Sequence, residues 1–392
     1  MTDVVITGAA RTAIGSYGRG LKDIAPSDLG ATASKAAMER AQVDPADVGH
    51  VVFGNVIHTE PGDMYMARVV GIKSGIPQET PAYTVNRLCG TGVQAIVSAA
   101  QTIQTGEAEI ALAGGAESMS RGQYWMPGAR WGARMGDAPL VDAVVGALTD
   151  PFDQDHMGIT AERLAERGGI SRERQDAFAA ESHHRAAAAR AGGRFKDQIV
   201  PVEVKVKKET ISFDQDEHIR AEVDADAMAK LKPAFKGDGT VTAGNASGLN
   251  DAGAAVVLMS AKEAERRGAP VLGRILAYAS CGVDPRIMGI GPVPATRTVL
   301  KRAGRSLDEV GVIELNEAFA AQALAVIDEL GLDEQKVNPN GGAIALGHPV
   351  AATGAAITVK LLAEMERGDH ELGLVTLCIG GGQGIAMLVG RG

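Results

Sequence analysis

Residues Asp47 to Asn55 read DVGHVVFGN, and this stretch decides the fold because residues Asp308 to Asn316, DEVGVIELN, parallel it. Each stretch contains a short apolar run, and runs of this length are typical of buried strands. Leu112-Ala113-Gly114-Gly115 likewise parallels Cys378-Ile379-Gly380-Gly381. The sequence therefore predicts two copies of one structural unit. In this register the turn that holds Cys89 corresponds to the turn that holds His348, since both follow an asparagine and precede a Gly/Ala-rich helix.

Both halves alternate short strands with alanine-rich helices, which is the pattern of α/β layers with buried strands. Strands are predicted at Val4–Ile6, Val51–Phe53, Ile110–Leu112, Val312–Glu314 and Leu374–Leu377, and helices at Leu29–Ala41, Gly92–Thr105, Val293–Gly304 and Ala352–Glu366.

Between about Glu117 and Leu249 the composition changes: this region holds both tryptophans, many methionines, a charged helical stretch from Ser171 to Ala191 and a basic polar stretch. We interpret it as an inserted domain whose composition suits a lid or binding module over the scaffold. The predicted domains are residues 1–117 plus 250–270, the insertion 118–249, and residues 271–392.

Composition excludes several classes of protein. The 392 residues carry a net charge of −9 and only 4% aromatic residues, which disfavours a nucleic-acid partner. The first fifteen residues lack the features of a signal peptide, and no long apolar run suggests a membrane span, so we expect a cytoplasmic protein. Three cysteines without CxxC spacing predict neither a disulfide framework nor a metal site.

Cys89 lies in Asn86-Arg87-Leu88-Cys89-Gly90-Thr91-Gly92, between an extended segment and a helix rich in small residues. The helix dipole and free N–H groups would favour a thiolate there. The glycines fit an elbow that needs positive φ and lets a substrate carbonyl approach the backbone. A core cysteine in a glycine turn is an equally open interpretation of this segment alone.

His348 stands in the glycine-rich loop Gly341 to Pro349, where a histidine is more often a surface or satisfied residue. A thiol nucleophile, however, needs a nearby imidazole to take its proton. Cys378 precedes a run of glycines that can direct N–H groups, such as that of Gly380, at an oxyanion. Two cysteines and a histidine suit a reaction that needs both an acyl carrier and a separate acid/base at carbon.

Asn316 follows a predicted strand and opens a helix, so it is either a helix cap or a holder of a water or substrate oxygen. Cys281 has no base nearby in the sequence and is interpreted as structural.

Together these segments resemble the thiolase superfamily, specifically its acetyl-CoA acetyltransferase or 3-ketoacyl-CoA thiolase branch. The resemblance runs nearly end to end and is carried by AARTAIG, NRLCGTG, GGAESMS, DHMG, TAGNASGLND, NEAFAAQA, GGAIALGHP and CIGGGQG, in this order. It implies a five-layer αβαβα fold of two duplicated α/β halves with an inserted loop domain.

The resemblance also implies a ping-pong mechanism: Claisen condensation of acetyl-CoA with an acyl-CoA, or thiolysis of a short-chain 3-ketoacyl-CoA. Cys89 would carry the acyl group, assisted by His348, and Cys378 would move the α-proton. His348 and a water held by Asn316 would stabilise the enolate, and the N–H groups of Cys89 and Gly380 would form a second oxyanion site.

By the same resemblance, coenzyme A is a substrate and product rather than a permanent cofactor, and no metal is required. Ser247 should contact the pantetheine and Arg220 the nucleotide phosphates; the other expected substrate contacts are Leu148, His156, Met157, Phe235, Ala243, Leu249, Met288, Ala318 and Phe319. A local supply of basic residues suits an anionic CoA, although most of these lysines fit a solvated face equally well. They are Arg194, Lys196, Lys205, Lys207, Lys208 and Arg220.

Three other functions would each account for part of the sequence. A decarboxylating ketoacyl synthase on the same fold lacks the second cysteine, so Cys378 argues against it. A non-catalytic CoA or lipid carrier predicts loss of Cys89, His348 or Cys378, and all are present. A Rossmann dehydrogenase fails because GxGxxG spacing is absent near Gly8.

Relatives of this kind assemble as dimers or dimers of dimers, so a homotetramer is expected. The segment around Trp125 to Met135 resembles the one that ties tetramers together and fits a lid equally well. Ala351, where the family usually has glycine, and Leu315, where a small residue is common, depart from the pattern and put the substrate range in question. Such enzymes serve fatty acid metabolism and polyhydroxyalkanoate precursor synthesis among other pathways.

Overall fold

The duplicated stretches form equivalent strands in the computed structural model, which describes residues 2–392. β3 (His50–Gly54) lies parallel to β5 (Ile110–Ser118), and β13 (Val312–Leu315) lies parallel to β14 (Leu372–Ile379). On its other side β3 pairs in parallel with β4 (Ala82–Val85), while β13 has the equivalent parallel bridge from Ile313 to Val337. The strand pairings therefore confirm the duplication.

The register predicted for the second pair of segments is wrong. Gly115 pairs with Gly54, and Thr376 pairs with Leu315. Since Gly54 and Leu315 hold the same place in the duplicated stretches, Gly115 corresponds to Thr376 and not to Gly381. Small and aliphatic residues recur along any buried strand, so local likeness does not fix which residues pair.

Both sets of strands join into one sheet, which has eleven strands within residues 2–392. The two halves meet where β1 (Val4–Thr12) runs antiparallel to β12 (Gly273–Gly282) over two residue pairs. The strand order is β4-β3-β5-β11-β1 in one half and β12-β15-β14-β13 in the other. In this order β11 is Asn250–Ser260 and β15 is Gln383–Gly390. Two short strands pair beside it, β2 (Gly15–Ser16) with β11 and β8 (Ile199–Val200) with β1.

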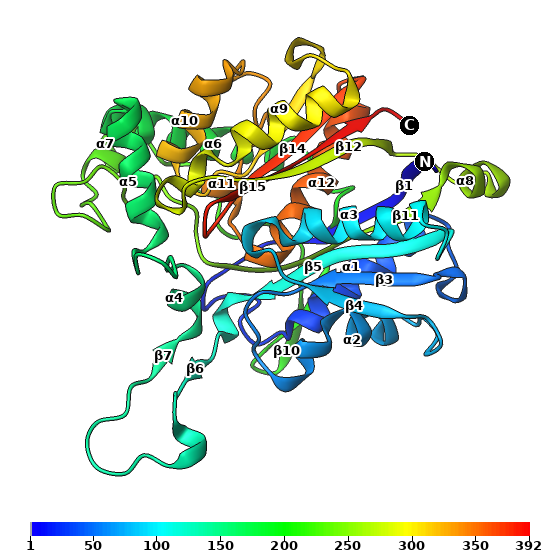
Figure 1. Cartoon of the computed structure of the whole chain (residues 1–392), viewed down its shortest axis with the longest axis horizontal. Coiled ribbons are helices and arrows are strands. Elements are labelled where there is room, and N and C mark those ends of the chain that lie inside the picture. Colours follow the sequence, from blue (N-terminus) through cyan, green and yellow to red (C-terminus); the bar gives the residue numbers. More distant parts are fainter. Residues whose placement is uncertain (1) are drawn as a thin grey trace.

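Helices complete the five layers αβαβα that the sequence predicts (Figure 1). The central pair, α3 (Thr91–Gln104) and α12 (Val350–Arg367), packs its apolar side chains against strands of both halves. The outer face of the first half is covered by α1 (Pro26–Arg40) and α2 (Met66–Lys73). The outer face of the second half is covered by α9 (Pro292–Ala303) and α10 (Ala320–Leu330).

Glycines let the two central helices touch along their backbones. A Cβ at Gly92 would lie 2.3 Å from the nitrogen of Ala355, and one at Gly354 would lie 2.5 Å from the nitrogen of Val93. These distances are too short for any larger residue, so this crossing fixes how α3 and α12 sit against each other.

The region between β5 and β11 lies largely outside the sheet. It contains the predicted charged helix as α6 (Arg172–Ala191) and a long loop that projects from the body between β6 (Tyr124–Trp125) and β7 (Val141–Asp142) (Figure 1). Its other elements are α4 (Ala143–Ala147), α5 (Met157–Gly168), β9 (Val202–Val206), β10 (Glu209–Phe213) and α7 (Ala225–Ala229). Two short helices lie after it in the chain, α8 (Ala261–Arg267) and α11 (Ala343–Leu346).

A buried ion pair fastens this region to β1. Arg11 donates from both guanidinium NH2 groups to the carboxylate of Asp216, at 2.7 and 2.9 Å, and both side chains are almost completely buried. The same carboxylate accepts from the backbone of Ile14. Among residues 2–392, no helix is long and apolar enough to cross a membrane.

Candidate active site

Cys89 lies in a single turn of 3-10 helix, Leu88–Gly90, that leads directly into α3. The Oδ1 atom of Asn86 accepts from the N–H of Leu88 at 2.9 Å, and the hydroxyl of Thr91 accepts from the N–H of Arg87 at 2.8 Å. These two bonds hold the predicted strand-to-helix elbow, and Cys89 is left half-buried at its tip.

The predicted source of strain in this elbow is wrong in one respect. The positive φ belongs to Leu88, at 45°, whereas Gly90 has an ordinary φ of −83°. Position 90 requires glycine for another reason, since a Cβ added there would lie 2.6 Å from the side chain of Ile379. A leucine held in the left-handed region costs of order 1 kcal/mol or more, which the surrounding contacts must offset.

The thiolate expected at Cys89 is not what its surroundings favour. Burial raises the pKa of the Cys89 thiol to about 11, and the nearby Glu117 carboxylate raises it further, although the N–H groups of Gly380 and Cys89 itself favour the thiolate. Desolvation disfavours the charged form and here exceeds the stabilisation from those N–H groups. Cys89 is therefore a thiol at neutral pH and needs a base.

His348 can serve as that base, because it lines the same cavity as Cys89 and its imidazole is neutral. Burial lowers its pKa to about 4, so the imidazole is neutral and able to accept a proton. Its Nδ1 lies 2.6 Å from the hydroxyl oxygen of Thr353, and that hydroxyl donates to the carbonyl of Pro349 at 3.0 Å. Because the Thr353 hydroxyl proton is donated to Pro349, the Thr353 oxygen must accept from the imidazole. This places the imidazole proton on Nδ1 and leaves Nε2 unprotonated and able to accept a proton.

The loop that carries His348 is held by two side chains from the other half of the molecule. Oδ1 of Asn250 accepts from the N–H of His348 at 2.9 Å. Oε2 of Glu117 accepts from the N–H of Ala351 at 2.9 Å, while its Oε1 binds Asn55 and Ile57 at 3.0 Å. Burial raises the pKa of Glu117 to about 8 despite these donors.

Asn316 contacts the imidazole rather than capping a helix. Its Nδ2 lies 3.5 Å from Nε2 of His348, and its Oδ1 is buried without a hydrogen-bond partner among the described residues. The helix α10 begins four residues later, with Phe319 at its cap position. The capping interpretation is therefore wrong, and the amide is available to a substrate oxygen or a water.

Cys378 lies at the end of β14, fully buried, and close enough to Cys89 that the charge of Cys89 affects its thiol. Burial raises the pKa of Cys378 well above its usual range, with the charge of Cys89 as a smaller cause in the same direction. The glycines that follow turn the chain, with φ of 80° at Gly381 and 86° at Gly382. The turn directs the N–H of Gly380 at the sulfur of Cys89, as the pKa of Cys89 reflects.

Three of these groups line one apolar cavity of about 390 Å³, namely Cys89, His348 and Gly380. Asn316 and Cys378 are buried and are not part of its lining. Ten of the residues expected to contact the substrate also line it: Leu148, His156, Met157, Phe235, Ala243, Ser247, Leu249, Met288, Ala318 and Phe319. The ring of His156 stacks on Phe235 with 4.6 Å between centroids.

Arg220 and the other basic residues do not line this cavity. Arg220 is exposed and donates its backbone N–H to Nδ1 of His183 at 3.2 Å. Arg194 instead contacts Asn340 and Glu364. The apolar lining has no basic group for a phosphate, so a nucleotide would have to lie outside it.

The sequence did not predict several lining residues, because they are ordinary apolar residues, some of them inside the motifs, that carry no chemical signal of their own. They are Leu88, Met119, Val144, Val145, Ala147, Ala234, Ala246, Gly248 and Val350. Leu315 packs in the core with α9 and β14 and does not reach the cavity, so its departure from the pattern does not narrow the site.

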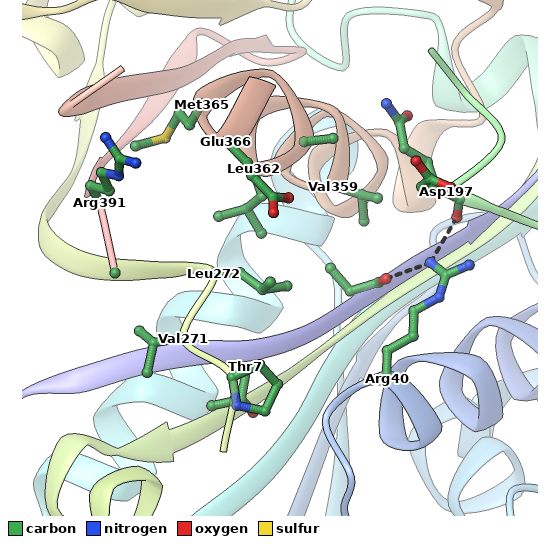
Figure 2. A pocket seen from close by; sticks show the side chains of 15 residues that line it. Thr7, Arg40, Asp197, Val271, Leu272, Val359, Leu362, Met365, Glu366 and Arg391 are labelled. Atoms are coloured by element: carbon green, nitrogen blue, oxygen red, sulfur yellow. Dashed lines mark hydrogen bonds between the residues drawn. The ribbon is translucent and has the colours of Figure 1, made fainter. Parts of the chain in front are cut away.

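A second cleft of about 370 Å³ lies elsewhere, among the ends of α1 and α12, the linker to β12 and the C-terminus (Figure 2). Its Arg40 donates to the backbone carbonyls of Ala9 and Gln198, at 2.7 and 3.2 Å. No cysteine or histidine lines it. Across the described part of the chain, no group of three or more His, Cys, Asp or Glu residues is arranged to hold a metal ion. Cys281 lies 3.6 Å from the hydroxyl of Thr298 and packs against the core beneath α9.

Comparison with known families agrees with this geometry. Residues 4–262 match the family described as "Thiolase, N-terminal domain", and residues 269–391 match "Thiolase, C-terminal domain". The chain belongs to the thiolase family. The family places the two cysteines in different domains of the thiolase, Cys89 in the first and Cys378 in the second.

Full-length relatives support the same assignment. This thiolase is 60% identical to the beta-ketothiolase BktB of Cupriavidus necator, over 99% of each chain. Its structure matches the acetyl-CoA acetyltransferase of Bacillus anthracis with a TM-score of 0.98 and 45% identity, covering 100% of this chain and 99% of the other. It matches human mitochondrial 3-ketoacyl-CoA thiolase in complex with CoA with a TM-score of 0.97 and 46% identity, covering 100% and 98%.

Proposed function

We propose that this thiolase cleaves, and in reverse forms, 3-ketoacyl-CoA thioesters with short acyl chains, and that the acyl group passes through Cys89. The proposal rests on one arrangement: two cysteines from different halves, next to a neutral imidazole whose Nε2 is free. One thiol is needed to carry the acyl group and the other to move a proton at carbon.

In thiolysis the proton of the Cys89 thiol passes to Nε2 of His348, and the thiolate attacks the 3-keto carbon. The N–H groups of Cys89 and Gly380 stabilise the oxyanion that forms. The bond between the second and third carbons then breaks, leaving the acyl group on Cys89. The electron pair of that bond becomes the enolate of acetyl-CoA, whose oxygen is stabilised by His348 and Asn316.

Cys378 gives its proton to the enolate carbon, which releases acetyl-CoA. The high pKa of Cys378 keeps it protonated until that step. An incoming CoA thiol gives its proton to the Cys378 thiolate and attacks the acyl-Cys89 thioester. The acyl-CoA leaves, and the Cys89 thiolate takes back the proton held by His348. Condensation is the reverse sequence, in which the Cys378 thiolate removes the α-proton of acetyl-CoA.

Coenzyme A would enter along the apolar cavity with its pantetheine beside Ser247. The backbone of Ser247 already donates to the carbonyl of Ala318 at 3.0 Å, which leaves its hydroxyl for a pantetheine amide. Arg220, outside the lining, would meet the phosphates at the entrance. These contacts, and the absence of a permanent cofactor, are proposals drawn from the family resemblance.

The test follows the enolate absorbance of acetoacetyl-CoA after addition of CoA, in the wild type and in Cys89→Ala, Cys378→Ala and Cys281→Ala. The wild type and the Cys281→Ala control should consume the substrate, and the other two variants should not. Cys378→Ala should still take up one acetyl group from acetyl-CoA, detectable by mass, because Cys89 and its base His348 are both retained. Turnover by Cys89→Ala would overturn the proposal.

We further propose that residues 118–249 form a separate loop domain and that the projecting loop joins four copies into a tetramer in the cytoplasm. The loop exposes large apolar side chains, including Trp131 at 84% and Met135 at 100% exposure. An exposed apolar group of this size usually marks an interface. Light scattering on the wild type and on Trp131→Ser/Met135→Ser should show a tetramer only for the former.

A further inference from the structure

The two cysteines pack in two different apolar clusters. Cys89 lines the cavity and packs against a buried cluster that includes Met119, Val144 and Val350. Cys378 is buried outside the lining, in another cluster whose members Met157, Met288 and Phe319 do line the cavity. An acyl group bonded to the sulfur of Cys89 therefore starts beside the first cluster, whereas the acetyl unit deprotonated by Cys378 lies beside the second.

The wall beside Cys89 is assembled from three separate elements. Met119 follows β5, Val144 lies on α4, and Val350 is the first residue of α12. Their exposed fractions are 1%, 3% and 2%, and all three line the cavity. None carries a charge or a hydroxyl, so the wall has no partner for a polar group on the acyl chain and can accept only a hydrocarbon tail.

Val144 lies on a short helix near the protein surface. The helix α4 has five residues, and the neighbouring Val145 is 51% exposed. Behind Val144 lies Gly122, where a Cβ would come within 2.4 Å of a Val144 methyl group. The side chain of Val144 thus lines the cavity on one side and contacts the position of residue 122 on the other, so we expect its size to affect the depth of the cavity.

We propose that Val144, backed by Gly122 and flanked by Met119 and Val350, sets the length of the acyl chain that Cys89 accepts. This rests on the proposed function and adds a specificity-determining residue to it. Val144→Ala removes two methyl groups and deepens the wall. Gly122→Ala has the opposite effect, because its new Cβ pushes Val144 into the cavity.

The experiment measures kcat/KM for thiolysis of 3-ketobutyryl-, 3-ketohexanoyl- and 3-ketooctanoyl-CoA. Relative to the wild type, Val144→Ala should raise the ratio of the longest to the shortest substrate by about fourfold for each methylene accommodated. Gly122→Ala and Val144→Ile should lower it. Leu276→Ala, an aliphatic truncation on the partly exposed strand β12, is the matched control and should leave the ratio unchanged.

The outcomes separate the two claims. If the wild type thiolyses none of these substrates, the proposed function and the assignment of Val144 both fall. If thiolysis is normal but the folded variants all keep the wild-type ratio within twofold, only the assignment of Val144 is overturned. Gly122→Ala and Val144→Ile narrow the cavity, and Val144→Ala widens it. If any one of these variants fails to fold, the substrate ratios of the other two still test the assignment of Val144.

Discussion

Thr353→Val removes the hydroxyl that holds His348 while keeping the shape of the side chain. In the wild type the Thr353 oxygen accepts from Nδ1–H of His348 at 2.6 Å inside a buried site. Valine leaves that N–H without an acceptor, and the loss is greatest when the imidazole carries the proton of Cys89. A hydrogen bond to a charged group contributes about 1.5–3 kcal/mol, so kcat should fall roughly 10- to 150-fold.

The assay is steady-state thiolysis of acetoacetyl-CoA by the wild type, Thr353→Val and the matched variant Thr353→Ser. Thr353 is a positioning residue that does not line the cavity, so KM for CoA should change by no more than about twofold while kcat falls. Thr353→Ser keeps the acceptor and should retain most of kcat. The reasoning is refuted if folded Thr353→Val turns over at more than half the wild-type rate, or if Thr353→Ser is as slow as Thr353→Val.

Three further predictions follow from charge and burial. Since the pKa of Cys89 is raised to about 11, its alkylation by iodoacetamide should accelerate steadily from pH 7 to 10. Glu117→Gln should speed the alkylation at pH 8, because the change removes a negative charge near the thiol. A plateau of the alkylation rate near pH 8 in the wild type would contradict this. The pKa of Glu117 is raised from 4.5 to about 8, so the folded chain holds an extra proton between these pH values and the free energy of unfolding should fall as pH rises through them. In Glu117→Gln the urea midpoint should lack this part of its dependence on pH. Identical pH dependence of the urea midpoint in both proteins would argue against the prediction. Arg11→Met should lower stability by about 3–5 kcal/mol because it leaves Asp216 buried and unpaired, and the double change with Asp216→Leu should recover much of the loss in the urea midpoint; a double variant no better than Arg11→Met would speak against a charge effect.

Local sequence carries most of the secondary structure and the identity of the reacting groups. The strands around Val51 and Val312 and the helix from Ser171 lie where apolar runs and helix-forming residues predict them. The site was found because cysteine and histidine in glycine-rich turns are rare combinations with few chemical explanations. Ordinary apolar residues such as Val144 carry no such signal, since only the folded chain shows which of them face the cavity.

The errors share a physical cause, which is that they depend on contacts between distant parts of the chain. The thiolate expected at Cys89 follows from its own helix, but burial by surrounding elements has the larger effect on its pKa. The elbow's need for a small residue at position 90 comes from Ile379, which lies in the other half, whereas the positive φ falls on Leu88. The register of the repeat is set by strand pairing, and Gly115 and Gly381 look alike in sequence although only Gly115 pairs within the sheet.

The corrected register assigns one place in the duplicated unit to both Glu117 and Cys378. Glu117 accepts from Asn55, Ile57 and Ala351, so in the first half this position holds loops together. In the second half the same position lies beside Cys89 and supplies a thiol. Duplication thus made positioning and proton transfer available at equivalent points of the two halves.

The nucleophile and its base are divided between the halves in the same way. Cys89 precedes α3 and His348 precedes α12, so their separation depends on how these two helices cross. That crossing is fixed by backbone contact at Gly92 and Gly354, where no side chain can yield. Since a misplacement of about 1 Å can cost a hundredfold in rate, the helix contact that stabilises the fold also sets the geometry of proton transfer.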